Sequence, residues 1–362
     1  MDKVPYEIFH KIASFLPFSH VSSLAKTNRH IHNTLKPFIW RHVIIKNKGN
    51  IDTLLDAFNE DNTLPKYIHS MVIRHVQGSI YDPLQSCPVV HSLLQLLCLA
   101  VNLREMRLEY FEIDLQMVPE FLKVFKLLND CNLKTLEIFD TIHTGANIQL
   151  ILQATTKLEI LRLHTGPPTI NLIPLNIQEL CLNYIADEDL ERLGALLPQL
   201  RKMEIYCILE NDNDTVQLIT LPHMKKLSVL SLSKTKIHCP CLEYLHVKDI
   251  HSLENITGGS NLTLVLEDET LLQTNCVYSH VYRCQLTDSW YGMDNFPMLL
   301  KALPCVEELV IESKWAYDIQ AVVCGWTSLK KIILTEKTEP FYGFVGFKLV
   351  YISRMKKVYV RA

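Results

Sequence analysis

The residues best suited to metal chemistry in this sequence lie between positions 223 and 246. Cys239 and Cys241 flank a proline, His238 precedes them, and His223 and His246 lie on either side. Thiolates and imidazoles bind zinc, but a structural zinc site needs four ligands, usually as two spaced pairs. Here one Cys-x-Cys pair has no second pair to match it. We therefore expect a tight turn with two partly buried thiols and no metal.

Signatures of catalysis are absent from the sequence. It has no glycine-rich phosphate loop, no H-E-x-x-H and no G-x-S-x-G, and only 11 of its 362 residues are glycine. Each of these motifs places phosphate-binding amides, zinc ligands or a nucleophile at a fixed spacing. We therefore expect no catalytic residue and no cofactor, and a protein that is not itself an enzyme but acts by binding.

The composition argues against a nucleic-acid-binding, membrane-spanning or secreted protein. The net charge of −3 gives no reason to expect nucleic acid as the main ligand. Asp2, Lys3 and Glu7 lie where an apolar secretory signal would have to be, and the most apolar segment, residues 88–103, is too short to span a membrane. We therefore expect no membrane contact, a cytoplasmic and/or nuclear location, and 11 reduced cysteines.

The first forty or so residues have the periodicity of three short amphipathic helices. Ser19 and Thr27 can cap the second and third helices, and Pro37 is expected to end the third. Helices this short cannot bury all of their apolar surface among themselves, so we expect one face to bind a partner. The apolar residues of the first helix recur at three- and four-residue intervals, at Ile8, Ile12, Phe15 and Leu16.

This stretch resembles an F-box, the motif that docks substrate receptors onto the Skp-type adaptor of cullin–RING ubiquitin ligases. The resemblance rests on a Pro-x-Glu-Ile start at residues 5–8, a Leu-Pro break at 16–17, and a Pro-x-x-Trp end at 37–40. Val4 and Ile39 replace leucines of the family pattern and keep apolar bulk. The resemblance implies an adaptor-binding face made of Pro5, Ile8, Ile12, Phe15, Leu16, Val21, Leu24, Ile31, Pro37 and Trp40.

A different interpretation is that the three helices form an ordinary cap that seals the end of the domain behind them. Repeat proteins need terminal caps with a polar outer face. A pure cap has no need for both the Pro-x-Glu-Ile start and the Pro-x-x-Trp end, which favours the docking face.

Beyond residue 65, one pattern recurs: an apolar residue, two residues, an apolar residue, one residue and another apolar residue. Copies are mostly about 19 to 30 residues apart, which covers the leucine-rich repeat period and runs slightly over it. The alternation in the second half of each copy predicts a short strand with one buried face. The copies are Ile68-Met71-Ile73, Leu103-Met106-Leu108, Leu133-Leu136-Ile138, Leu158-Leu161-Leu163, Ile177-Leu180-Leu182, Leu200-Met203-Ile205, Leu227-Leu230-Leu232, Leu242-Leu245-Val247, Val281-Cys284-Leu286, Val306-Leu309-Ile311, Leu329-Ile332-Leu334 and Met355-Val358-Val360.

Segments between the copies predict return helices over 118–128, 148–155 and 190–197, whereas the interval from Leu227 to Leu242 is too short for a helix and predicts an extended return. Neither a strand nor its return can bury its apolar face alone, which is the logic of a solenoid. The pattern resembles the leucine-rich repeats that commonly follow an F-box. The expected fold class is α/β. It comprises an F-box module of three helices (1–45), a connector (46–64) and a curved leucine-rich-repeat solenoid (65–362). That solenoid has about 11 to 12 irregular repeats, with a parallel concave sheet and outer helices. Residues 252–276 are hard to phase.

The strand alternation also predicts which side chains line the concave face. Tyrosine, phenylalanine and arginine on such a surface are typical of binding hot spots. The residues expected to bind substrate are Arg107, Phe139, Arg162, Tyr206, Tyr244, Arg283 and Tyr359. Others expected on this face are Glu105, Glu137, His164, Lys202, Glu204, His246, Glu308, Lys331 and Lys357. An anion site of Arg107, Arg162, Lys202 and Arg283 would form if the curvature brings them together.

The resemblance implies a non-catalytic, substrate-recognition subunit of an SCF-type ubiquitin ligase. Its partners would be the Skp-type adaptor, through it a cullin and a RING protein, and a protein substrate. Two alternatives remain open: an F-box scaffold that acts outside ubiquitin transfer, and a repeat-only interaction protein with a helical cap.

Overall fold

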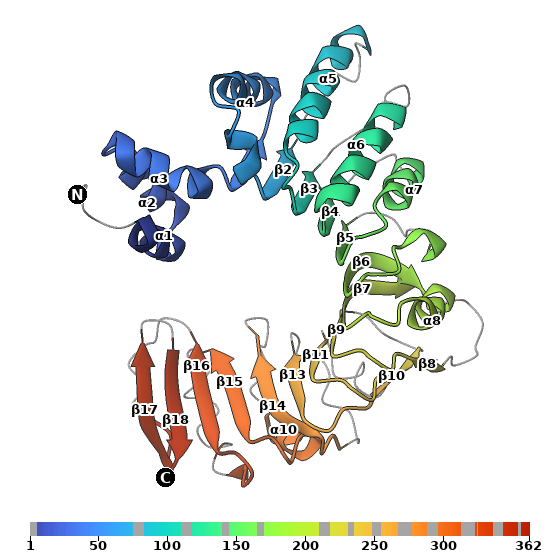
Figure 1. The fold of residues 1–362 in the computed structure, drawn as a ribbon. Helices are drawn as coiled ribbons and strands as arrows, with labels where there is room; N and C mark the ends of the chain where they lie inside the picture. Colours follow the sequence, from blue (N-terminus) through green and yellow to red (C-terminus); the bar gives the residue numbers. More distant parts are fainter. Residues whose placement is uncertain are drawn as a thin grey trace. The chain divides into compact units, whose positions relative to one another are not determined.

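The computed structural model divides the chain into two compact units, residues 1–177 (unit 1) and 178–362 (unit 2). Both units are mixed α/β with mostly parallel strands, so the predicted α/β class is confirmed (Figure 1). The residues that the structure describes are 6–74, 83–109, 118–139, 145–164, 170–209, 218–230, 235–247, 255–266, 277–287, 296–312, 323, 325–335, 343–353 and 356–362.

Unit 1 begins with three helices that enclose a small core of their own. The helices are α1 (Tyr6–Phe15), α2 (Phe18–Ala25) and α3 (Arg29–Ile39). Three short helices bury about one apolar residue per turn here, which leaves apolar surface uncovered elsewhere on them. The core consists of Phe9, Ala13, Val21, Ala25, Ile31 and Leu35, with Leu16, Leu24, Phe38 and Ile39 packed against it.

Two of the predicted helix caps are wrong. Ser19 lies inside α2, because Pro17 takes the N-cap position with a φ of −56°, a value that the proline ring imposes. Asn28, and not Thr27, caps α3, and its side-chain oxygen accepts a hydrogen bond of 2.7 Å from the backbone N–H of His30. The hydroxyl of Thr27 instead donates backward to Leu24, so it is unavailable as a cap.

Pro37 does not end the third helix as predicted. It lies inside α3, which continues to Ile39, and the N–H of Trp40 donates to the carbonyl of Lys36 over 3.0 Å. Proline removes only its own N–H from the helical ladder, so one further turn can form beyond it.

The sheet of unit 1 is parallel and follows the order of the chain. Neighbouring strands pair in the order β1-β2-β3-β4-β5. A parallel pair needs a crossover connection, and helices supply it here. The elements are β1 (His42–Ile45), α4 (Lys48–Glu60), the 3₁₀ helix Leu64–Tyr67, β2 (Ser70–Arg74), α5 (Pro83–Leu99), β3 (Glu105–Glu109), α6 (Val118–Cys131), β4 (Thr135–Phe139), α7 (Gly145–Ala154), β5 (Ile160–His164) and the 3₁₀ helix Ile170–Leu172.

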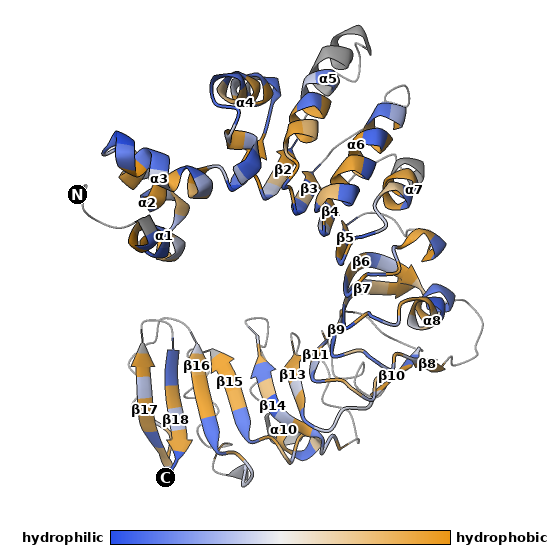
Figure 2. Cartoon of the chain, viewed as in Figure 1, coloured by the Kyte–Doolittle hydropathy of each residue, from blue (hydrophilic) through white to orange (hydrophobic). Residues whose placement is uncertain are grey.

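The helices of unit 1 lie side by side along one face of its sheet, α4 beside α5, α5 beside α6, and α6 beside α7 (Figure 1). Each shows an apolar and a polar side (Figure 2). The predicted repeat positions Met71, Met106, Leu136 and Leu161 stand in register across the strands and are all buried. The opposite face of the sheet, called the open face below, carries the residues between them.

The predicted connector, residues 46–64, contains α4, whereas the strand that joins the sheet lies just before it. β1, at the end of the predicted 1–45 module, pairs with β2, and Asn47 caps α4, because its side-chain oxygen accepts the N–H of Asn50 over 3.0 Å. Asparagine is a preferred N-cap, so a helix starts within the predicted connector.

Unit 2 continues the same pattern with shorter returns. Its parallel strands pair in the order β6-β7-β9-β11-β13-β14-β15-β16, and three short return strands form a second parallel sheet in the order β12-β10-β8. The predicted extended return between residues 227 and 242 is confirmed as β10. The elements are β6 (Glu179–Ala186), α8 (Asp187–Leu196), β7 (Lys202–Leu209), β8 (Leu218–Thr220), β9 (Lys226–Val229), β10 (Lys236–His238), β11 (Tyr244–Val247), β12 (Ile256–Thr257), β13 (Leu262–Leu266), β14 (Val281–Leu286), α10 (Phe296–Ala302), β15 (Glu308–Glu312), β16 (Lys331–Thr335), β17 (Phe347–Ser353) and β18 (Lys356–Arg361).

One repeat copy was predicted three residues too late. Leu227 stands opposite Met203 and Val229 opposite Ile205, so the copy is Met224-Leu227-Val229. All three of its side chains are buried, whereas Leu230 is only half-buried. In the stretch that could not be phased, Leu264 and Leu266 of β13 continue the buried rows of β11.

The last predicted copy is wrong in direction. β18 is antiparallel to β16 and to β17, and Tyr359 stands opposite Ile332 on the buried face. Reversal of a strand keeps the alternation of its side chains but changes which residues share a face with a given neighbour. Tyr359 is therefore buried, 2% exposed, and its ring meets that of Phe344 edge-on at 5.2 Å.

Candidate functional site

The first candidate surface is an exposed apolar patch on the N-terminal helices. Ile8, Ile12 and Phe15 of α1 are 48%, 44% and 78% exposed, and Phe18 at the start of α2 is 56% exposed. Positions i, i+4 and i+7 of a helix share one face, and Phe9 and Ala13, on the neighbouring face, pack in the core. We call Ile8, Ile12, Phe15 and Phe18 the α1–α2 patch. Phe18 was missed, although an apolar residue directly after the Leu-Pro break signalled it.

The other predicted adaptor-binding residues divide between the core and its rim. Val21 and Ile31 were predicted to contact the adaptor, but they lie inside the three-helix core. Their side chains are 3% and 1% exposed, so they cannot touch a partner in this conformation. Leu16, Leu24 and Pro37 are half-buried. The half-buried ring of Trp40 lies 6.0 Å from that of Phe58 in α4. Pro5 lies outside the described residues.

The second candidate surface is the open face of the unit 1 sheet, where charged residues are paired from strand to strand. Glu109, which is buried, forms ion pairs with Arg74 and with Nε of Arg107, the latter over 2.6 Å. Glu137 accepts contacts of 3.5 Å from both Arg107 and His164. Arg107 and Glu109 are neighbours along β3, and the other pairs stand opposite or diagonal to one another in the strand register. Each charge therefore has a neighbour of opposite sign.

Two predicted binding residues, Arg107 and Phe139, meet in the same network. The guanidinium of Arg107 lies 4.1 Å from the centre of the Phe139 ring, which stacks on His164 at 3.9 Å and 13°. A cation over an aromatic face is an attractive contact, so the stack holds these side chains in place. Arg162 stands opposite Glu137 on the next strand.

The predicted anion site is not supported by these contacts. Arg107 is occupied by two carboxylates, Lys202 pairs with Glu179 over 3.2 Å, and Arg283 pairs with Glu308 over 3.1 Å. Cations already held by carboxylates offer little additional attraction for an anion.

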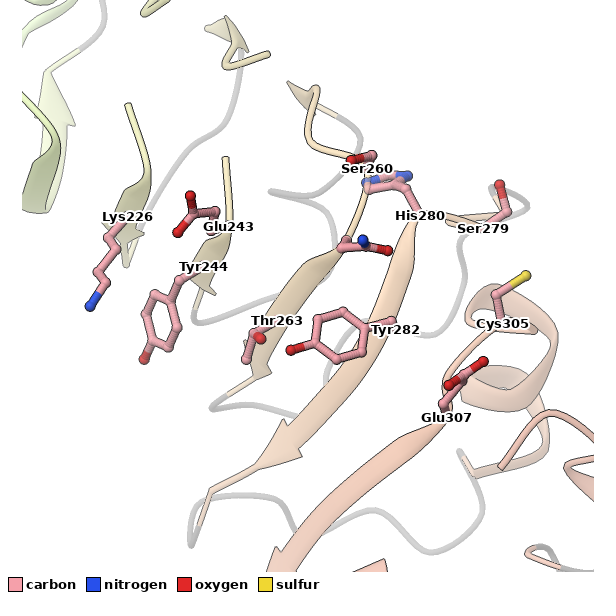
Figure 3. A pocket seen from close by; sticks show the side chains of 11 residues that line it. Lys226, Glu243, Tyr244, Ser260, Thr263, Ser279, His280, Tyr282, Cys305 and Glu307 are labelled. Carbon is pink, nitrogen blue, oxygen red and sulfur yellow. The ribbon is translucent and has the colours of Figure 1, made fainter. Parts of the chain in front are cut away.

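The third candidate surface is a groove in unit 2 with a volume of about 720 Å³. It crosses β9, β11, β13 and β14 and the start of β15, and Figure 3 shows its side chains. A smaller hollow of about 240 Å³ on the open face continues it, because Lys226 and Tyr244 line both. The principal lining residues of the groove are Lys226, Tyr244, Thr263, His280, Tyr282 and Glu307, and those of the hollow include Lys202, Glu204, Ser228 and His246.

The acidic residues that line the groove are neutralised from outside it. Lys225 lies 2.7 Å from Glu243, and its hydrogen bond and charge hold the pKa of that carboxyl below its usual value. Lys330 lies 2.7 Å from Glu307 in the same way. Burial lowers the pKa of His280, which keeps this imidazole neutral at physiological pH.

The predicted substrate-binding residues of unit 2 are not all in the groove. Tyr244 lines it, whereas Tyr206 is 63% exposed on β7 and lines neither hollow. Arg283 forms an ion pair with Glu308. Tyr359 was predicted to lie on the substrate-binding face, but it faces the core. Among the remaining predicted open-face residues, Lys331 also pairs with Glu308, over 2.7 Å.

Sequence reasoning missed Lys226 and Tyr282 as groove residues. The predicted copy Leu227-Leu230-Leu232 was three residues too late, so Lys226 was not assigned to the strand. In the observed copy Met224-Leu227-Val229, Lys226 lies on the open face. Tyr282 is an extra residue at a β-bulge, since Leu262 pairs with Val281 and Thr263 with Arg283. No local sequence signal marks that bulge.

Residues 239–242 form the expected turn, in which the N–H of Leu242 donates to the carbonyl of Cys239 over 3.1 Å, but the prediction of two partly buried thiols is wrong. Cys239 is buried, which raises the pKa of its thiol to about 12, whereas Cys241 is exposed. Gly258 has a φ of +114°, and a Cβ there would lie 2.2 Å from the carbonyl oxygen of Cys239, so only glycine fits. Within the described residues, no group of three or more His, Cys, Asp or Glu side chains could hold a metal ion.

Comparisons with known proteins provide no family assignment. No family model matches the chain, and no curated protein matches its sequence. None of the helices that the structure describes is both long and apolar enough to cross a bilayer.

Proposed function

We propose that this chain is a substrate-recognition subunit of an SCF-type ubiquitin ligase that binds a Skp-type adaptor through the α1–α2 patch. The observation that carries the proposal is the exposure of Ile8, Ile12, Phe15 and Phe18 on helices that already have a core of their own. A patch of this kind on a complete small module is typical of a protein-binding site. The resemblance of residues 5–40 to an F-box indicates which partner it would take.

The energetics of the patch agree with a docking role. Covering a fully exposed phenylalanine side chain stabilises a complex by roughly 1.5–3 kcal/mol, and Phe15 is 78% exposed. Ile8, Ile12 and Phe18 add smaller contributions around it. Leu16 and Leu24 are partly buried against the three-helix core, and Trp40 lies against Phe58 of α4.

The remaining part of the proposal concerns the α/β region, a leucine-rich-repeat solenoid in this reading. Its open faces would hold a protein substrate and bring its lysines close to the conjugating enzyme that the cullin carries. Proximity alone accelerates such a transfer, so the receptor contributes position and effective concentration and no bond-making groups.

The experiment is a binding titration of the full chain with purified Skp-type adaptor, with an Ile12→Asp, Phe15→Asp double variant beside it. Two charges in an apolar interface should weaken binding at least about hundredfold, equivalent to about 2.7 kcal/mol. Asn33→Asp is the matched control, since it adds a charge at an exposed position of α3, away from the patch. Circular dichroism verifies that all variants keep their helices.

Two results would count against the proposal. Absence of adaptor binding by the intact chain would reduce the three helices to a cap. Adaptor binding without recruitment of cullin and RING protein would indicate a scaffold outside ubiquitin transfer.

A further inference from the structure

A row of side chains crosses the groove of unit 2 at right angles to its strands. Lys226 on β9 stands opposite Tyr244 on β11, and Tyr244 opposite Thr263 on β13. In β14, Arg283 stands opposite Thr263, and the bulge adds Tyr282 beside it, with its hydroxyl directed toward Thr263 in Figure 3. Bulges commonly redirect a side chain toward a functional surface. The four side chains therefore form one continuous strip, called the Lys226–Tyr282 strip below.

Lys226 supplies the positive charge of the strip. Among the residues that the structure describes, Lys226 forms no ion pair, although its charge helps to lower the pKa of Glu243; the flanking acids Glu243 and Glu307 are paired with Lys225 and Lys330. An acidic group of a ligand can therefore approach Lys226 with little repulsion. One such cation is far fewer than the six to ten phosphate contacts, roughly, that give nucleic-acid binding its strength.

The dimensions and residue types suit a polypeptide. Adjacent strands are about 4.8 Å apart, so β9 to β14 spans roughly 14 Å, the length of about four extended residues. Tyr282 is 38% exposed, and tyrosine rings are preferred anchors in protein interfaces. The hydroxyls of Thr263, Ser260 and Ser279 line the same groove and can bond to a peptide backbone.

We propose that the Lys226–Tyr282 strip binds an extended acidic segment of a partner protein, with a carboxylate or phosphate against Lys226 and its backbone across the rings of Tyr244 and Tyr282. If the partner is a substrate for ubiquitin transfer, this deepens the proposed function and rests on it. The binding step itself does not require the adaptor.

The test uses fluorescein-labelled pools of eight-residue peptides and the immobilised full chain. Each pool has one fixed central residue, glutamate, phosphoserine, glutamine or lysine, and random residues elsewhere. The glutamate or phosphoserine pool should be retained at least tenfold more than the glutamine and lysine pools. Retention of both acidic pools identifies any anionic side chain as the ligand, and retention of phosphoserine alone identifies a phosphate.

Variants connect the preference to the strip. Lys226→Ala should abolish the acidic preference, and Tyr282→Ala should lower retention about tenfold. Lys236→Ala and Tyr206→Ala are matched controls, because both residues are exposed on unit 2 and line neither hollow. Equal retention of all four pools, or an acidic preference that survives Lys226→Ala in a chain with an unchanged melting temperature, would overturn the inference.

The same preparations separate this inference from the proposed function. The Ile12→Asp, Phe15→Asp variant should keep full peptide binding, and Lys226→Ala should keep full adaptor binding. Peptide binding by a chain that never binds adaptor would leave the strip established and the ligase proposal refuted. The reverse result would refute the strip alone.

Discussion

The open faces of the two units are built from the same alternating pattern and yet differ in what they offer a partner. In unit 1, Arg74, Arg107, Glu109 and Glu137 alternate in sign across neighbouring strands and pair with one another. In unit 2, the neighbours of Lys226 in the register are Lys202 and Tyr244, so no acid lies opposite it. Cross-strand neighbours therefore decide whether a charged side chain is engaged or available.

The largest expected difference concerns the two sides of the unit 2 sheet. Complete burial raises the pKa of Cys284 to about 12 from 9.0, so at pH 8 its reactive thiolate is about a thousandfold scarcer than that of an ordinary thiol. Cys305 is exposed and lines the groove. Iodoacetamide should therefore modify Cys305 at least about a thousandfold faster, as measured by mass spectrometry of the digested chain. Equal rates in the folded chain would show that the groove is closed, and equal rates in urea serve as the control.

A second prediction separates the buried tyrosine of β18 from the open face. Tyr359→Ala should lower the free energy of unfolding by about 3 kcal/mol, because it removes a buried ring that contacts Phe344. Tyr244→Ala should cost less than about 1 kcal/mol, since Tyr244 is only half-buried. Urea titrations followed by circular dichroism measure both. Similar costs would place Tyr359 on the open face after all.

A third prediction tests the ion network directly. Glu109→Gln should destabilise the chain by about 2 kcal/mol, because it removes the charge that both Arg74 and Arg107 contact. This value is below that of a fully buried pair, since both arginine side chains are 38% exposed and solvent screens them. The matched change Glu204→Gln, at an exposed position of unit 2, should alter stability by less than about 0.5 kcal/mol. Equal effects would remove the contrast between the two faces.

The smallest effect is expected at a surface ion pair. A hydrogen bond from Lys36, which is the largest cause, and two from the hydroxyl and the N–H of Thr63 lower the pKa of Asp61 to about 2 from 3.8. Because the carboxylate is favoured in the folded chain, its contribution to stability is present above pH 4 or so and is lost as the pH falls toward 2. Carbon NMR of the Asp61 carboxyl should give a midpoint near pH 2. In Lys36→Ala the midpoint should rise toward 3.8, and an unchanged midpoint would contradict the assignment to Lys36.

Much of the fold was predictable because strand alternation is a local signal. The copies at Met106, Leu136 and Leu161 became β3, β4 and β5, and the predicted returns over 118–128 and 190–197 became α6 and α8. The phase failed at Leu227, because Leu230 and Leu232 continue the apolar spacing and make two phases equivalent in sequence. The direction of β18 could not be predicted, since a period of two reads the same along either strand direction.

The candidate sites were predictable only where exposure follows from helical spacing. Ile8, Ile12 and Phe15 share an exposed helix face. Val21 and Ile31 are equally apolar in the sequence, but they are buried in the core. The position of Tyr282 depends on a bulge, which arises from pairing with β13 and leaves no trace in the local sequence. Packing between elements, and not the pattern within them, decides these cases.

The reversed strand β18 also limits how such a chain can lengthen. Parallel strands from β13 to β16 each receive the next one along the same edge, so duplicating an internal repeat would preserve every pairing on both sides. A copy added directly after β16 would compete with β18 for the edge of β16, which β18 already occupies along Lys331–Thr335. Duplication within the array therefore keeps every pairing, whereas a copy after β16 requires β18 to move to the new strand.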